Sequence, residues 1–222
     1  MRDPRADFHA ELDQVEALLQ DEAQLCRHAL TSVIGALTTR SVDVAREVIA
    51  RDDEIDSLHV LIESTVESVL ARQAPLAVDL RLALTMIHIN LHLERIGDQC
   101  VNIAKLSLLI GEEPLSRELQ WDFAAMGDQC EVMLETAMRA FGARDLAGAE
   151  SLVAMDQVVN RANHGLGRRI LQSGGDPEDG LRAIVIGRCL ERIGDNAVDI
   201  GERCAYLITG QLREFTDASR AT

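Results

Sequence analysis

The sequence predicts an all-α protein that consists of two tandem three-helix bundles related by internal duplication. Its composition favours long helices, because only four of 222 residues are proline and aromatic residues make up 3%. With 47% hydrophobic residues, the core must consist mainly of aliphatic side chains, as in helical bundles. Apolar residues recur at intervals of three or four along residues 44–69, which indicates helix. A hexapeptide that occurs twice indicates the duplication.

Breaker residues divide the first half into three expected helices, over about residues 5–39, 42–72 and 76–110. Ser41 can cap the start of the second helix with its hydroxyl group. The second helix should end before Pro75, because a residue that precedes proline disfavours the helical conformation. The third should stop at Gly111, with Pro114 just beyond it.

Similar breakers divide the second half into expected helices over about residues 116–141, 146–171 and 177–212. Ser116 can open the first of them, and the stretch 142–145 separates it from the next. The loop Ser173-Gly174-Gly175-Asp176 precedes the last helix, in which Pro177 occupies a first helical position. We therefore assign the two bundles to residues 1–112 and 113–222.

The two halves are related in sequence. Leu93-Glu94-Arg95-Ile96-Gly97-Asp98 recurs unchanged 97 residues later, as residues 190–195. One helix earlier, residues 50–56 resemble residues 154–160, at an offset of 104. The two offsets differ by about two helical turns. Duplication of a three-helix unit accounts for both matches, and we expect each unit to bury its own apolar stripe.

Acidic and amide side chains follow one face of the third and the sixth expected helices. They are spaced by three or four residues, which places them on the same face: Glu94, Asp98 and Asn102, and then Glu191, Asp195, Asp199 and Glu202. Each like-charged pair four residues apart costs about 0.2–0.5 kcal/mol. A helix selected for stability alone would place lysine or arginine at these steps, so the repeated acids suggest a function.

The helix before each acidic helix adds further oxygen donors at the same spacing, Asp52 and Asp56 in the first half and Asp156 and Asn160 in the second. If these helices pack antiparallel, the donors converge into sites suited to magnesium, manganese or iron. A solvated acidic face is the alternative. Gly97 and Gly194 interrupt the acidic helices at a cost of about 1 kcal/mol each, which suggests close helix contact beside the acids.

Several other functions are disfavoured. The net charge of −15 repels nucleic acids and anionic membranes, and no apolar run is long enough for a membrane span. The sequence shows no signal peptide, and its five scattered cysteines suggest free thiols in a reducing cytoplasm. His88 and His92 point away from Glu94 and Asp98 on their own helix, and a ferritin-like pair of Glu-x-x-His helices is missing. Without a phosphate loop or a nucleophile–base pair, we expect no enzyme activity.

The paired hexapeptides, together with Val101-Asn102-Ile103-Ala104 and the segments 47–56 and 73–81, resemble the PhoU family of phosphate-transport regulators over nearly the whole chain. The resemblance implies two bundles related by a pseudo-twofold axis, with metal ions such as iron or zinc on acidic motifs. The matching residues are Asp52, Asp56, Glu94, Asp98, Asn102, Asp156, Glu191, Asp195, Asp199 and Glu202. The first half has Lys105 at the repeat position where the second half has Glu202. The second half has Asn160 where the first half has Asp56, so each site lacks one carboxylate.

The resemblance also implies a regulatory role. Such proteins connect the PstB-like ATPase of the phosphate ABC transporter to a PhoR-like sensor histidine kinase, and repress phosphate-starvation signalling when phosphate is plentiful. We expect a cytoplasmic homodimer that acts in this way. Two alternatives stay open: a helical metal-binding or metal-storage protein, and an accessory protein of a low-affinity phosphate permease.

Overall fold

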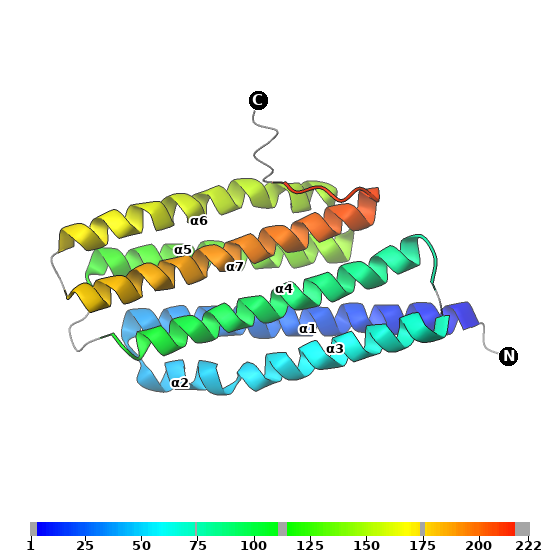
Figure 1. Ribbon diagram of the computed structural model, residues 1–222, viewed down its shortest axis with the longest axis horizontal. Helices are drawn as coiled ribbons and strands as arrows, with labels where there is room; N and C mark the ends of the chain where they lie inside the picture. Colours follow the sequence, from blue (N-terminus) through cyan, green and yellow to red (C-terminus); the bar gives the residue numbers. More distant parts are fainter. Residues whose placement is uncertain (1–3, 74, 111–114, 174–175, 216–222) are drawn as a thin grey trace, which may run out of the picture.

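The computed structural model describes residues 4–73, 75–110, 115–173 and 176–215 (Figure 1). The described residues form helices and no strand, which confirms the all-α prediction. The helices are α1 (Pro4–Thr39), α2 (Val42–Ala50), α3 (Asp52–Gln73), α4 (Val78–Ser107), α5 (Arg117–Ala143), α6 (Leu146–Ser173) and α7 (Pro177–Thr209). With α2 and α3 taken as one interrupted helix, these are the six expected helices.

The interruption at Arg51 is the main departure from the expected helices. Arg51 still donates its N–H to the carbonyl of Glu47 at 3.0 Å, but its ψ is −1°. A new helix then starts, because Asp52, Asp53 and Glu54 occupy the first turn of α3, where negative charge is stabilising. The Arg51 guanidinium also pairs with Glu54 at 3.0 Å. The expected helix over residues 42–72 therefore has the right extent and is interrupted at its tenth residue.

Local sequence signals fix several helix ends. The hydroxyl groups of Ser41 and Ser116 accept hydrogen bonds from the backbone N–H groups of Val44 and Leu119, which confirms both caps. Pro177 is at the start of α7, as expected. That helix ends at Thr209 rather than Leu212, because Gly210 adopts the left-handed conformation, with φ of 71°. Gly111, Pro114 and the two glycines at 174–175 lie outside the described residues.

Each half is a bundle whose long helices all pack against one another, α1, α3 and α4 in the first half and α5, α6 and α7 in the second (Figure 1). The two bundles pack through α1 against α5 and through α4 against α7. Each of these pairs joins a helix to its own repeat counterpart, as in an isologous interface. Among the described residues, the buried side chains form one cluster that extends across both halves, so the apolar stripes of the two units meet in a common core. The division of the chain at residues 112 and 113 stays a prediction.

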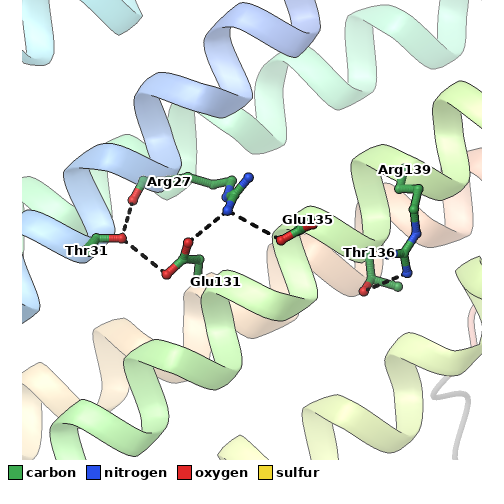
Figure 2. Close-up of polar contacts among 6 residues, drawn as sticks. All are labelled: Arg27, Thr31, Glu131, Glu135, Thr136 and Arg139. Carbon is green, nitrogen blue, oxygen red and sulfur yellow. Dashed lines mark hydrogen bonds and ion pairs between the residues drawn. The ribbon is translucent and has the colours of Figure 1, made fainter.

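Contacts across the α1–α5 interface explain why the core is shared. A Cβ atom at Gly127 of α5 would lie 2.6 Å from Cγ1 of Ile34 on α1, so glycine allows these helices to approach closely. At the edge of the interface, the Arg27 guanidinium lies 2.9 Å from Glu131 and 3.4 Å from Glu135 (Figure 2). Such half-exposed pairs contribute about 0–1 kcal/mol each, so apolar packing supplies most of the attraction between the halves.

Two buried thiols show how closely the halves correspond. The Cys26 S–H donates to the carbonyl oxygen of Leu93 at 3.2 Å, and the Cys130 S–H donates to that of Leu190 at the same distance. The donors are 104 residues apart and the acceptors 97, which are the two offsets of the sequence repeat. A residue of the first half therefore has an equivalent in the second half, found by adding 104 on α1 and α3 and 97 on α4.

Candidate functional site

The second acidic cluster lies where α6 packs against α7. A Cβ atom at Gly194 would lie 3.0 Å from Oδ1 of Asp156, so the repeated glycine lets a buried carboxylate approach the backbone of α7. The Asn160 amide donates to Oδ2 of Asp156 at 2.6 Å. Oδ1 of Asp156 and Oδ1 of Asn160 are buried and have no hydrogen-bond partner among the described residues. These two oxygens are available to a ligand.

Asp195 and Glu191 complete this cluster on α7. Burial, followed by the charges of Asp156 and Glu191, raises the pKa of Asp195 to about 6. Glu191 accepts hydrogen bonds from Asn163 on α6 and from the Arg188 guanidinium. Asn163 was not among the expected site residues. It lies three residues after Asn160, a spacing that puts both amides on one face of α6, and its counterpart at the 104-residue offset is His59.

Asp199 and Glu202 have other partners. Oδ2 of Asp199 lies 3.5 Å from Nδ1 of His92 on α4, and the same ring nitrogen is 2.9 Å from Oδ1 of Asn196. Glu202 accepts a hydrogen bond from the backbone N–H of Phe215 at 2.6 Å. Asp199 therefore faces the α4–α7 interface, and Glu202 holds the segment that follows α7. His92 is buried, and it contacts Asp199, one of the expected site acids, across the interface between the halves.

The first acidic cluster lies at the equivalent contact between α3 and α4. A Cβ atom at Gly97 would lie 3.0 Å from Cδ1 of Ile55 and 3.7 Å from Oδ1 of Asp52. Burial, followed by the charges of Asp56 and Asp98, raises the pKa of Asp52 to about 6, although Lys105 opposes this shift. The structure therefore brings these carboxyl groups within electrostatic reach of one another.

The remaining members of the first cluster lie on α4. Burial, followed by the charge of Asp98, raises the pKa of Glu94. Asn102 is exposed on the same helix, as is Asp98. This cluster is thus more open to solvent than the second, in which Asp156 is only 5% exposed.

One buried acid was missed by the sequence analysis. Glu22 on α1 is 0% exposed, and neither carboxyl oxygen has a hydrogen-bond partner in the described part of the chain. Burial, followed by the charge of Glu94, raises its pKa from 4.5 to about 9. The signal was its position on the apolar stripe of α1, between Leu19 and Cys26. At the repeat offset, its counterpart is the buried Met126.

The donor set of both clusters suits a hard cation, because carboxylate and amide oxygens predominate. A cation would relieve the mutual repulsion that raises these pKa values. Across the ranges that the structure describes, no three histidine, cysteine, aspartate or glutamate side chains are arranged to hold a metal ion. Binding at either cluster would therefore need carboxylate side chains to turn toward one another.

Comparison with known proteins explains the duplicated architecture. A family model described as the PhoU domain matches residues 19–107 and residues 123–204. The chain belongs to the PhoU family. Each matched segment takes in one acidic cluster of this PhoU chain, together with most of the three helices around it.

Individual PhoU proteins are similar over nearly the full chain. The PhoU homolog 1 of Thermotoga maritima, a phosphate-specific transport system accessory protein, is 31% identical over 213 residues, which cover 94% of this chain and 92% of that protein. The PhoU homolog of Pseudomonas aeruginosa is 31% identical over 207 residues, covering 91% and 86%. The chain is thus a member of a family of accessory proteins of phosphate transport.

Solved PhoU structures confirm the fold. The crystal structure of the phosphate transport system regulatory protein PhoU from Streptococcus pneumoniae superposes with a TM-score of 0.87 at 28% identity, covering 93% of this chain and 99% of that one. PhoU from Pseudomonas aeruginosa gives 0.85 at 30% identity, covering 92% and 100%. Of the helices in the described ranges, none is long and apolar enough to cross a membrane.

Proposed function

We propose that this chain represses phosphate-starvation signalling when phosphate is plentiful, as an adaptor between the ATPase of a phosphate ABC transporter and a sensor histidine kinase. The observation that carries the proposal is the PhoU match in both halves of the chain. Similar proteins are accessory or regulatory components of phosphate transport. The net charge of −15 supports docking to basic surfaces of protein partners. In this proposal the chain acts by binding and not by catalysis.

Deleting the chain from its host should leave a phosphate-starvation reporter active at high phosphate. The expected result follows from loss of the repressing partner, and the measurement is reporter activity in high-phosphate medium. Re-expression of the wild-type chain should restore repression. Normal repression in the deletion strain, with altered phosphate uptake, would instead favour an accessory role for a low-affinity phosphate permease.

We also propose that the acidic clusters bind cations. The support is the buried, unpartnered Oδ1 of Asp156 among the described residues, and the raised pKa values of Asp52 and Asp195, to which neighbouring carboxylates contribute. Iron, zinc, manganese and magnesium are candidates, since oxygen donors predominate. A bound cation would supply positive charge that lets the carboxylates of α3 and α4, and of α6 and α7, approach.

We expect the second cluster to bind a cation more tightly than the first. Lys105 places a positive charge near Asp52, whereas the position of Lys105 in the repeat is occupied by Glu202 in the second half. Asp195→Asn should therefore weaken calorimetric binding of Mn²⁺ by at least about tenfold, and Asp98→Asn should weaken it less. An equal or greater loss from Asp98→Asn would contradict this ranking.

A further inference from the structure

A buried polar layer lies inside the first bundle, next to Glu94 of the first acidic cluster. It contains Glu22 on α1, which is 0% exposed, and Asn90 on α4, which is 1% exposed. His59 on α3 contributes its Nδ1 atom. Both Glu22 oxygens, Nδ1 of His59 and Oδ1 of Asn90 are buried without a hydrogen-bond partner among the residues that the structure describes. Buried polar atoms in proteins nearly always have one.

Two hydrogen bonds place these residues at the same level. Nδ2 of Asn90 donates to the backbone carbonyl of His59 at 3.0 Å, which joins α3 to α4 and turns Oδ1 of Asn90 away from that carbonyl. The Cys26 S–H donates to the carbonyl of Leu93 at 3.2 Å. Because α1 and α4 run parallel (Figure 1), the helical rise puts Glu22, one turn before Cys26, at about the level of Asn90, about one turn before Leu93.

The second half shows that the fold does not require this polar layer. At the repeat offsets, the counterparts of Glu22, His59 and Asn90 are Met126, Asn163 and Gly187. Met126 is 1% exposed, and a Cβ atom at Gly187 would lie 2.6 Å from Oδ1 of Asn163. The equivalent layer therefore contains an apolar side chain, a direct helix contact and one polar residue, Asn163, which donates a hydrogen bond to Glu191. In the first half, the same three positions carry Glu22, His59 and Asn90, on three different helices.

We propose that Glu22, His59 and Asn90 bind one divalent cation in the interior of the first bundle. A carboxylate, an amide oxygen and an imidazole nitrogen form a donor set that Mn²⁺ and Fe²⁺ accept. The positive charge would neutralise Glu22 beside Glu94, whose charge reaches it. The three donors belong to neither surface cluster, but the site adjoins Glu94 of the first cluster, which interacts electrostatically with both Glu22 and His59. The proposal does not depend on the regulatory role of the chain.

The test is equilibrium binding of Mn²⁺ to the full chain, followed by electron paramagnetic resonance. Asp98→Asn and Asp195→Asn provide a background in which the surface clusters are weakened. In this background we expect one Mn²⁺ per chain, with nitrogen modulation from an imidazole ligand. Adding Glu22→Met, which introduces the residue of the second half, should weaken this binding at least about tenfold. His59→Gln should abolish the nitrogen modulation.

Two controls separate loss of the site from loss of the fold. Asp21→Asn removes an exposed charge from the neighbouring position of α1 and should leave Mn²⁺ binding unchanged. Glu22→Gln keeps the size of the side chain and should lose the ion while circular dichroism shows full helicity. The proposal fails if the Asp98→Asn, Asp195→Asn variant binds Mn²⁺ equally well with and without Glu22→Met. It also fails if the background binds none, which would mean that the layer holds only water.

Discussion

Replacing Glu94, Asp98, Glu191 and Asp195 together by their amides should give a folded protein that no longer represses phosphate-starvation genes. Folding should persist because helix packing depends on the apolar core rather than on acids that repel one another. Folding raises the pKa of Asp195 to about 6, so its ionisation at pH 7 destabilises the fold. The amide variant should therefore melt at a higher temperature than the wild type in the presence of a chelator.

A phosphate-regulated reporter provides the functional measurement, with circular dichroism as the check on folding. We expect reporter activity at high phosphate to equal that of the deletion strain. The matched control replaces four exposed acids outside the clusters by amides, Glu63, Glu67, Asp128 and Glu150. This control has the same net charge and should repress normally. If the folded cluster variant also represses normally, the acids are not the functional surface.

Glu22→Met should raise the melting temperature of the metal-free protein by an amount on the order of 5 °C. An unpartnered buried polar group costs about 1–3 kcal/mol, and 1 kcal/mol corresponds to roughly 2–4 °C in a chain of this size. Methionine fills a similar volume, and it already occupies the counterpart position 126. The measurement is thermal unfolding in the presence of a chelator.

The stabilisation by Glu22→Met should grow with pH. Folding raises the pKa of Glu22 from 4.5 to about 9, so the folded protein holds a proton that the unfolded chain releases. The protonated side chain is accommodated below pH 4.5, and stability is lost as the pH rises from there toward 9. Methionine removes this dependence, so the gain should be larger at pH 8 than at pH 5. A difference that does not change with pH would show that Glu22 does not titrate in this way.

Much of the fold follows from local signals in the sequence. The caps at Ser41 and Ser116 and the start of α7 at Pro177 depend on residues within one turn, so the sequence predicts them correctly. The repeated hexapeptide predicts the correspondence of the two halves, including the glycines that sit against Asp52 and Asp156. The bend at Arg51 was missed because nearby apolar spacing continues through it.

The surroundings of each side chain were decided only by the tertiary structure. Helical spacing placed Asp195 and Asp199 on one face, but α6 lies beside the first and His92 of α4 beside the second. A glutamate is expected at the surface from its residue type, but Glu22 is buried because α3 and α4 cover that side of α1. Periodicity shows which residues share a helix face. The helix that covers this face comes from a distant part of the chain, so local spacing cannot identify it.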